Sequence, residues 1–385
     1  MSARAPKGLE GIFGRIIDAD VHHIWRSAAD LLPYMGPRGR DLLRVEGGGG
    51  ALLPVDPAGA TQPHQRAGIK RLDAAPANGT PAGSDYETLR DQLLEGMGVE
   101  FAILGFDVGY NSGVPNPYLG AEITRAANDW SIHEWLERDR RLCGGMLVST
   151  QWPAEAAAEI RRIGGHPKIV EVLLSFNAIG TLSFGHPVFH PLYEAAAELD
   201  LPIACHIGWA GVGPTLPAGV VSRFDNYTLF AFGAQHHLMS FIAHGVFEKY
   251  PNLRLKIMES GVAWLPWILQ NLDAQYGLLK EESLHVKRWP SEYFHDHVVM
   301  TTQPFDIADD KEQVVRLLET VDGVEDVLCF ASDYPHWDTD EPTHVRKLVP
   351  DGWLRRLFRD NAVRFYGSRG TAVGMTPLEL EMTSR

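Results

Sequence analysis

From about residue 85 onward, the chain alternates short apolar stretches with longer amphipathic ones. Short apolar runs favour buried strands, whereas apolar residues spaced three and four apart favour helices. The expected strands begin at Ile16 and then cover residues 99–104, 142–148, 169–176, 202–206, 253–258, 298–301 and 326–330. The expected helices cover residues 86–97, 119–137, 153–163, 191–199, 238–247, 264–277, 311–319 and 353–366. Eight strands alternating with helices predict an α/β fold, a (β/α)8 TIM barrel.

A doubly wound open sheet is the alternative, but that fold would need a glycine-rich phosphate loop between a strand and a helix. The run Gly47–Gly50 has no helix opening after it, so the barrel is favoured. A barrel with an insertion can account for residues 1–385 as one domain. Residues 26–85 are rich in Gly, Pro and Ala, which predicts a long insertion after the first strand and a partly ordered lid.

The charge and cysteine content narrow the class of protein. There are 35 Lys and Arg against 49 Asp and Glu, a formal net charge of -14, which argues against a nucleic-acid partner and favours a small-molecule substrate. Cys143, Cys205 and Cys329 each lie in an apolar run, as expected for free thiols in a reducing compartment. Residues 1–14 lack a signal-peptide pattern and no apolar run has membrane-spanning length, so we expect a cytoplasmic protein without a membrane partner.

The first strand, Ile16–His23, ends in a group of carboxylates and imidazoles. Side chains alternate between the two faces of a strand. One face would carry Asp18, Asp20 and His22, and the other Ala19, Val21 and His23. One short strand can therefore present a carboxylate and an imidazole together to a metal ion, although a solvated strand end is the alternative.

Three other expected strands also end in a metal-capable side chain: His206, Glu259 and Asp333. Functional residues of a TIM barrel lie at the carboxyl ends of its strands, so these side chains should meet those of Asp20 and His22. Imidazole nitrogen with carboxylate oxygen suits zinc, manganese or iron. The absence of cysteine at these ends indicates a catalytic site with open coordination positions.

Four further residues are expected to contact the substrate from loops and helix starts: Trp209, Arg223, His237 and His336. Arg223 can pair with a substrate carboxylate, and an aromatic wall suits a small organic molecule. Each residue also has a structural interpretation. Trp209 can pack within its loop, Arg223 can be solvated, and His336 can hydrogen-bond Asp333 instead.

The motifs GVFEKYPNL from Gly245, ESGVAWLP from Glu259, FASDYPH from Phe330 and DNAVRFYG from Asp360 carry a family resemblance. With them, the chain resembles the amidohydrolase superfamily, in the branch that includes aminocarboxymuconate-semialdehyde decarboxylase. The resemblance covers most of the chain. It implies a metal-dependent enzyme acting on a small molecule, and it makes a homodimer plausible.

The resemblance also implies roles for individual residues. Asp20-x-His22 takes the place of the family's usual His-x-His pair, and His206 is the implied strand-five ligand. Asp333 is the implied strand-eight ligand and can also take a proton from metal-bound water. The fourth strand ends without the lysine that bridges two metals in some relatives, so we expect one divalent ion, zinc before manganese or iron. A second ion held by Glu259 with a histidine of residues 236–237 is the alternative.

Glu259 departs from the related decarboxylases, which carry a histidine in the corresponding region. A glutamate can bind a metal or move protons, but it cannot polarise a carbonyl as a cation does. The sequence therefore ranks hydrolysis of a C–N or C–O bond in a small aromatic or cyclic carbonyl compound first. Asp333 is the expected base and Glu259 the expected proton shuttle or further ligand. Non-oxidative decarboxylation of an aromatic or muconate-type acid ranks second, and a non-haem iron oxygenase third.

Overall fold

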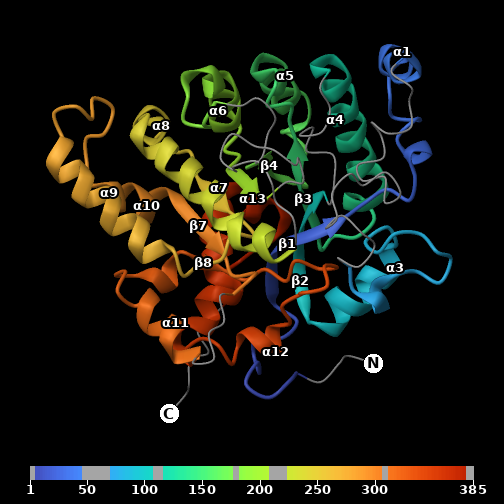
Figure 1. Ribbon diagram of the computed structural model, residues 1–385. Helices are drawn as coiled ribbons and strands as arrows, with labels where there is room; N and C mark the ends of the chain where they lie inside the picture. Colours follow the sequence, from blue (N-terminus) through green and yellow to red (C-terminus); the bar gives the residue numbers. More distant parts are fainter. Residues whose placement is uncertain are drawn as a thin grey trace.

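A computed structural model of the 385-residue chain describes residues 5–45, 70–106, 116–176, 182–207, 223–305 and 311–378. Its strands form one parallel sheet in the order β1 to β8, surrounded by helices (Figure 1). The strands are β1 (Ile16–His23), β2 (Val99–Phe106), β3 (Leu142–Leu147), β4 (Ile169–Ser175), β5 (Ile203–His206), β6 (Leu255–Ile257), β7 (Val298–Thr301) and β8 (Leu328–Cys329).

The last strand returns to the first. Ala19 N donates to the carbonyl of Phe330 at 2.9 Å, and Asp333 N donates to the carbonyl of Asp20 at 3.0 Å. A parallel bridge also pairs Val21 with Tyr334. These contacts make the sheet a nearly closed barrel, so the predicted α/β TIM barrel is confirmed.

Helices follow most strands. The longer helices are α1 (Pro37–Val45), α4 (Pro117–Ser131), α5 (Pro153–Ile163), α6 (His190–Glu198), α7 (Arg223–Ala243), α9 (Leu265–Leu279), α10 (Pro290–His297), α11 (Lys311–Leu318) and α13 (Asn361–Val373). The short ones are η1 (Ala28–Asp30), η3 (Leu72–Ala74), α3 (Tyr86–Leu89), η4 (Arg90–Gly96), η5 (Ile132–Leu136), η6 (Pro187–Phe189), α8 (Val246–Lys249), η7 (Val324–Asp326), α12 (Pro342–Val345), η8 (Asp351–Trp353) and η9 (Arg356–Asp360). No helix among the described ranges combines the length and apolarity needed to cross a lipid bilayer.

Helix boundaries follow local signals where these are strong. The side chain of Asn116 accepts from the backbone N–H groups of Tyr118 and Leu119 and starts α4, and Pro153 starts α5. The predicted start of the helix after β5 is wrong, because α7 already begins at Arg223 and not at residue 238. The first turns of α7 are rich in aromatic residues, whose helix propensity is low, so the pattern there suggested a loop.

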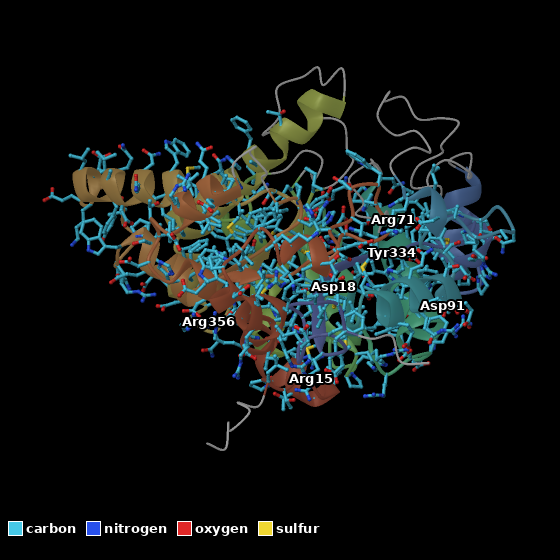
Figure 2. All side chains as sticks on the ribbon, turned by 90° about the horizontal axis from the view of Figure 1, so that it is seen from below. Arg15, Asp18, Arg71, Asp91, Tyr334 and Arg356 are labelled. Atoms are coloured by element: carbon cyan, nitrogen blue, oxygen red, sulfur yellow. The ribbon has the colours of Figure 1, made fainter. Side chains whose placement is uncertain are left out.

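The predicted insertion, residues 26–85, contains η1, α1 and η3 in its described parts, whereas residues 46–69, the centre of the expected lid, lie outside the described residues. The returning end of the insertion lies against the barrel. Lys70 forms an antiparallel bridge with His336, and Arg71 N donates to the carbonyl of Pro335 at 2.9 Å. The neighbouring labels of Arg71 and Tyr334 mark this contact in Figure 2.

The register between β1 and β2 shifts within β1. Asp18 pairs with Ala102 and Val21 with Leu104, so three steps along β1 match two along β2, as in a β-bulge. Ala19 packs in an apolar cluster with residues of α13, whereas Val21 packs in the main core. The predicted regular alternation along this strand is therefore wrong, because the extra residue interrupts it.

The helix α13 closes the end of the barrel at which the strands begin. Its residues Phe365 and Tyr366 pack against Ile17 and Phe101, which lie near the starts of β1 and β2. The opposite end, where the strands finish, carries the polar residues singled out in the sequence. Figure 2 shows Asp18 labelled well inside the molecule and Arg15, which precedes β1, at its edge.

Candidate metal centre

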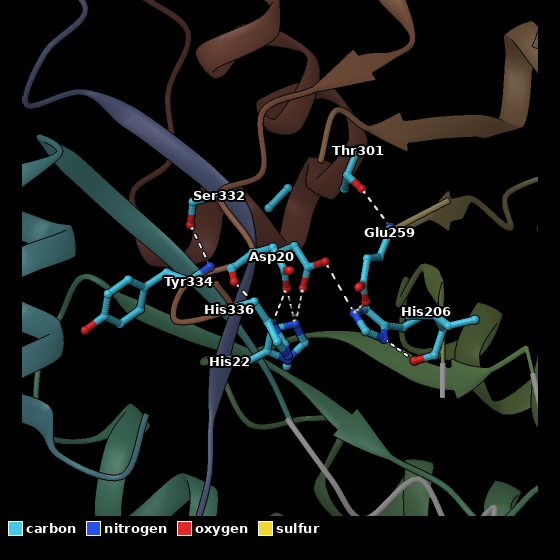
Figure 3. Close-up of polar contacts among 12 residues, drawn as sticks. Asp20, His22, His206, Glu259, Thr301, Ser332, Tyr334 and His336 are labelled. Carbon is cyan, nitrogen blue, oxygen red and sulfur yellow. Dashed lines mark hydrogen bonds and ion pairs between the residues drawn. The ribbon is translucent and has the colours of Figure 1, made fainter. Parts of the chain in front are cut away.

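Four side chains from distant parts of the chain meet at the carboxyl ends of the strands: Asp20, His22, His206 and Asp333. Each offers one ligand atom, and these atoms all lie within 4.8 Å of one another. All four residues are buried, with exposed fractions of 4% or less. We call this group the metal cluster (Figure 3). Its members are the four ligands predicted from the sequence.

Within the metal cluster, carboxylates and imidazoles alternate. His22 Nε2 lies 2.9 Å from Asp333 Oδ1 and 3.5 Å from Asp20 Oδ1. Burial raises the pKa of Asp20, but His206 and His22 outweigh burial and leave the pKa below its usual value. Burial also raises the pKa of Asp333, and His336 together with His22 more than reverses the effect. Both carboxyl groups are thus held ionised.

His206 is oriented by the backbone of the following residue. Its Nδ1 donates to the carbonyl of Ile207, so Nε2 is the nitrogen directed at Asp20 Oδ2, 3.5 Å away, and at Glu259 Oε2, 3.1 Å away. A hydrogen bond of this kind fixes the ring and leaves the other nitrogen for a metal ion. Burial lowers the pKa of His206, but the facing carboxylates raise it to about 9 in the absence of a cation.

The donor set fits a divalent cation. Both carboxylate oxygens of Asp20, Nδ1 of His22 and Oδ2 of Asp333 are buried without a hydrogen-bond partner. Such groups are costly to bury unless something compensates them, and a cation bound among them would do so. Two imidazoles with two carboxylates suit zinc, manganese or iron. The predicted single divalent ion therefore fits this site, while the preference for zinc stays a prediction.

The backbone is strained at two site residues. Glu259 has φ of +46° and Asp333 has φ of +58°, in the left-handed region that non-glycine residues rarely adopt. Strain of this kind costs about 1–3 kcal/mol for each residue and is concentrated at functional sites. The rest of the fold therefore compensates for this backbone strain, which directs the carboxyl groups of Glu259 and Asp333 into the site.

Glu259 lies beside the metal cluster without belonging to it. It is 4% exposed, and its backbone N–H donates to Thr301 Oγ1 at 3.3 Å. Burial, followed by the charge of Asp333, raises the pKa of Glu259 well above its usual value. The protonated form of Glu259 is therefore favoured more than in an exposed glutamate, and its carboxyl group lies next to the imidazole of His206.

His336 connects the metal cluster to the insertion. Its Nδ1 lies 2.6 Å from Asp333 Oδ1, and its Nε2 lies 2.8 Å from Lys70 Nζ. A lysine ammonium can only donate, so Nε2 accepts and Nδ1 carries the proton donated to Asp333. The predicted substrate contact of His336 stays a prediction, whereas its hydrogen bond to Asp333 is observed.

The other predicted substrate residues have different positions. Both ring nitrogens of His237 bond the backbone: its Nδ1 accepts from Phe184 N at 3.2 Å, and its Nε2 donates to the carbonyl of Phe176 at 3.0 Å, while its predicted substrate contact stays a prediction. Burial lowers its pKa to about 4, as suits this neutral ring. Trp209 lies outside the described residues, and Arg223 is the first residue of α7, with its side chain outside the description.

Two residues near the site were missed in the sequence. Lys70 stands at the end of the insertion, where no pattern placed it near the strand ends. Asp338 follows β8, and burial together with the charge of Asp333 raises its pKa to about 6. The sequence signal that could have identified Asp338 is its position close to the FASDYPH motif.

Removing one ligand is expected to empty the metal cluster. We expect purified wild-type protein to carry about one equivalent of zinc, manganese or iron, and His206→Ala to carry less than about a tenth of that, because the variant lacks one of the two imidazole ligands of the cluster. Elemental mass spectrometry on both proteins, with His237→Ala as a histidine control outside the cluster, measures this. Equal metal content in wild type and His206→Ala would exclude His206 as a ligand.

With this geometry described, comparison with known proteins identifies the family. The model of the amidohydrolase family matches residues 17–368. The chain belongs to this amidohydrolase family. The match includes every member of the metal cluster, Glu259 and His336, so the resemblance inferred from the motifs is confirmed.

Relatives of this amidohydrolase-family chain include gamma-resorcylate decarboxylases. The protein from Rhizobium sp. (strain MTP-10005) is 23% identical over 271 residues, covering 66% of this chain and 79% of the relative. The protein from Rhodococcus jostii (strain RHA1) is 24% identical over 269 residues, covering 65% and 78%.

Solved structures of similar fold include 5-carboxyvanillate decarboxylase from Novosphingobium aromaticivorans, in complex with manganese and 4-hydroxy-3-methoxy-5-nitrobenzoic acid. Its TM-score is 0.66 at 18% identity, covering 93% of this chain and 97% of that one. A dihydroxybenzoic acid decarboxylase from Polaromonas sp. JS666, with bound manganese and the inhibitor 2-nitroresorcinol, has a TM-score of 0.61 at 17% identity, covering 91% and 96%. At these identities the likeness establishes the fold.

Proposed function

We propose that this enzyme of the amidohydrolase superfamily is a metal-dependent carboxy-lyase that removes CO2 from a hydroxylated aromatic acid without oxidation. The observation that carries the proposal is a buried glutamate, Glu259, which lies beside a cluster of ligands for one divalent ion and whose pKa is raised by burial and by the charge of Asp333. The relatives named as decarboxylases of aromatic acids support the same reaction class.

Decarboxylation of an aromatic acid replaces a carboxylate by a proton. An acid protonates the ring carbon that carries the carboxylate, the C–C bond then breaks, its electron pair restores the aromatic ring, and CO2 leaves. The reaction needs a proton donor next to the substrate and no oxidant. Glu259 combines a raised pKa with a position beside the cluster, and its Oε2 lies 3.1 Å from His206 Nε2. We assign it the proton, which it regains from water.

The other residues prepare the site. Asp20, His22, His206 and Asp333 would hold the ion, which supplies a Lewis acid for oxygen atoms of the substrate. Asp333 stays a carboxylate because His22 and His336 hydrogen-bond it. The ligand side chains at the described ends of the strands are buried.

This proposal reverses the ranking drawn from the sequence. From the sequence alone, Glu259 favoured hydrolysis, because a glutamate cannot polarise a carbonyl as a cation does. Its raised pKa changes the argument, because the shift favours the protonated form, and a protonated carboxyl group is the acid that decarboxylation requires. The test must distinguish decarboxylation from two alternatives, which are hydrolysis of a C–N or C–O bond and oxygenation by non-haem iron. A single domain, a homodimer and a cytoplasmic location stay predictions.

The test is product analysis with metal-loaded enzyme. Manganese- or zinc-loaded protein is incubated with hydroxybenzoates such as 2,6-dihydroxybenzoate, and in parallel with aromatic amides and lactones. We expect one CO2 released for each acid consumed and, in D2O, deuterium on the carbon that lost the carboxylate. Hydrolysis of the amides or lactones without CO2 release would overturn the proposal, as would oxygen consumption by iron-loaded protein.

Replacing Glu259 tests its role as the acid. Glu259→Gln keeps the shape of the side chain but cannot deliver the proton, so kcat should fall about a thousandfold, the size typical of a lost general acid. Metal content should stay at one equivalent, because Glu259 lies outside the cluster. Steady-state kinetics and elemental analysis of the same preparation measure both. A kcat within threefold of wild type would remove Glu259 from the mechanism.

Replacing Lys70 tests the link between the insertion and Asp333. Lys70→Met removes the donor that makes His336 present its Nδ1–H to Asp333, so we expect kcat to fall about tenfold, the worth of one charge-assisted hydrogen bond. Arg71→Met is the matched control, because Arg71 pairs with Asp73 at the surface and should change kcat less than twofold. A larger KM for Lys70→Met with unchanged kcat would instead indicate a contact with the substrate.

A further inference from the structure

Three polar residues meet inside the barrel, near the metal cluster. Lys256 on β6 places its Nζ 2.8 Å from Glu171 Oε2 on β4 and 3.0 Å from the hydroxyl of Tyr366 on α13. Tyr366 also donates to Glu171 Oε2 at 3.0 Å. Because β4 and β6 are not neighbours in the sheet, these contacts run through the interior. We call Lys256, Glu171 and Tyr366 the interior triad.

An ion pair in the interior of a barrel requires a physical explanation. The interior of a TIM barrel is normally filled by layers of branched apolar side chains. Lys256, Glu171 and Tyr366 are all 0% exposed, and the desolvation of two buried charges offsets much or all of their attraction. A well-packed apolar pair of similar volume would stabilise a barrel at least as well, so stability alone does not account for the triad.

The contact that distinguishes the triad is made with β1. Lys256 Nζ donates to the backbone carbonyl of Ala19 at 2.6 Å, across the barrel. Ala19 and Asp20 lie within the bulge of β1 and have no partner residue in the register with β2. On the other side, Ala19 N and the carbonyl of Asp20 bond the segment after β8. The bulge is thus held between β8 on one side and Lys256 on the other.

The bulge determines where the first metal-cluster residue points. A bulge redirects the side chains that follow it, and Asp20 is the residue next to the carbonyl that Lys256 binds. We propose that the interior triad positions Asp20 for metal binding by holding the β1 bulge through the Ala19 carbonyl, with Lys256 as the positioning residue. The inference rests on the proposed function only in taking the metal cluster as a site for a divalent ion.

The test replaces the pair as a unit. The double variant Glu171→Leu/Lys256→Met keeps volume and removes one charge of each sign, so the net charge near the cluster is unchanged. We expect it to fold, with a melting temperature close to wild type, and to bind Mn²⁺ at least about tenfold more weakly in a calorimetric titration of metal-free protein. Amide exchange of the peptide covering residues 16–23, also without metal, should accelerate.

The control is a second ion pair that also bonds a carbonyl next to β1, made by a buried arginine and a glutamate whose side chain is 28% exposed. Arg359 bonds Glu100 Oε2 at 2.6 Å and the carbonyl of Arg15, at the start of β1 and away from the cluster. Arg359→Met/Glu100→Leu should leave the Mn²⁺ affinity within twofold of wild type. Equal weakening in both double variants would show a general structural effect and overturn the proposal.

If the double variant does not fold, a milder variant tests the proposed role of the interior triad. Tyr366→Phe removes the two hydrogen bonds that the Tyr366 hydroxyl makes with Lys256 and Glu171 and keeps the ion pair, so Mn²⁺ affinity should fall about threefold with faster exchange in residues 16–23. Unchanged affinity and exchange in the folded variant would overturn the inference. Wild-type protein that binds no divalent cation would instead overturn the proposed function, and the exchange measurement would still decide whether the triad holds β1.

Discussion

Asp333→Asn is expected to lower kcat about a thousandfold or more and to reduce the bound metal. The amide keeps the shape of the side chain but lacks the negative charge that the ion and the two neighbouring imidazoles require. His22 Nε2 lies 2.9 Å from Asp333 Oδ1 and His336 Nδ1 lies 2.6 Å from the same oxygen, so both rings lose an anionic acceptor. Steady-state kinetics and elemental analysis of the purified variant measure the two effects.

The control for this prediction is Asp340→Asn. Asp340 is also buried and follows β8, but its carboxylate is outside the metal cluster. We expect its kcat to stay within a few-fold of wild type and its metal content to be unchanged. If Asp333→Asn kept full turnover and its metal, Asp333 would be neither ligand nor catalytic residue. If both variants lost turnover equally, the loss would be caused by a disturbed fold of the segment after β8 and not by removal of a ligand.

Lys256→Met alone is expected to lower the free energy of unfolding by about 3–5 kcal/mol, the typical cost of removing one partner from a buried ion pair. Glu171 would be left in the interior without its ammonium, accepting only from Tyr366, and the Ala19 carbonyl would lose its donor. Chemical denaturation followed by circular dichroism measures the change. The single variant should thus be less stable than the double variant that also replaces Glu171.

Arg254→Met is the control for this stability prediction. Arg254 immediately precedes β6 and bonds Asp200 Oδ1 at 2.7 Å, but its side chain is partly exposed, at 22%. Ion pairs of this kind contribute about 0.2–1 kcal/mol. A loss for Lys256→Met no greater than that of Arg254→Met would contradict the view that the interior triad is a tightly buried unit.

Much of the fold follows from patterns along the sequence. Apolar runs alternating with amphipathic ones predicted the strands of the barrel, and the strands at 142–147, 169–175 and 298–301 lie within a residue of their expected bounds. Local chemistry suffices here, because each strand is buried by the helices that follow it. Helices α10 and α12 were missed, since both are short and rich in polar residues.

The metal cluster was also accessible from the sequence. Parallel strands of a barrel bring their carboxyl ends together, so a metal-capable side chain at the end of several strands predicts a shared site. Asp20, His22, His206 and Asp333 were named on this basis together with the family resemblance, and the structure brings them within 4.8 Å. The hydrogen bonds of both ring nitrogens of His237 could not be predicted in this way, because their partners, Phe184 and Phe176, are brought to the ring by the tertiary fold.

The sequence by itself determined the barrel, the end of the barrel that carries the site and the types of side chain gathered there, because these depend on periodicity and strand order. Tertiary structure alone decided the raised pKa of Glu259, the contact of Lys70 with His336 and the bond from Lys256 to the Ala19 carbonyl. Burial and cross-barrel distance fix these three features. The local sequence pattern around a residue predicts neither burial nor cross-barrel distance, because both depend on which distant segments the closed barrel brings into contact.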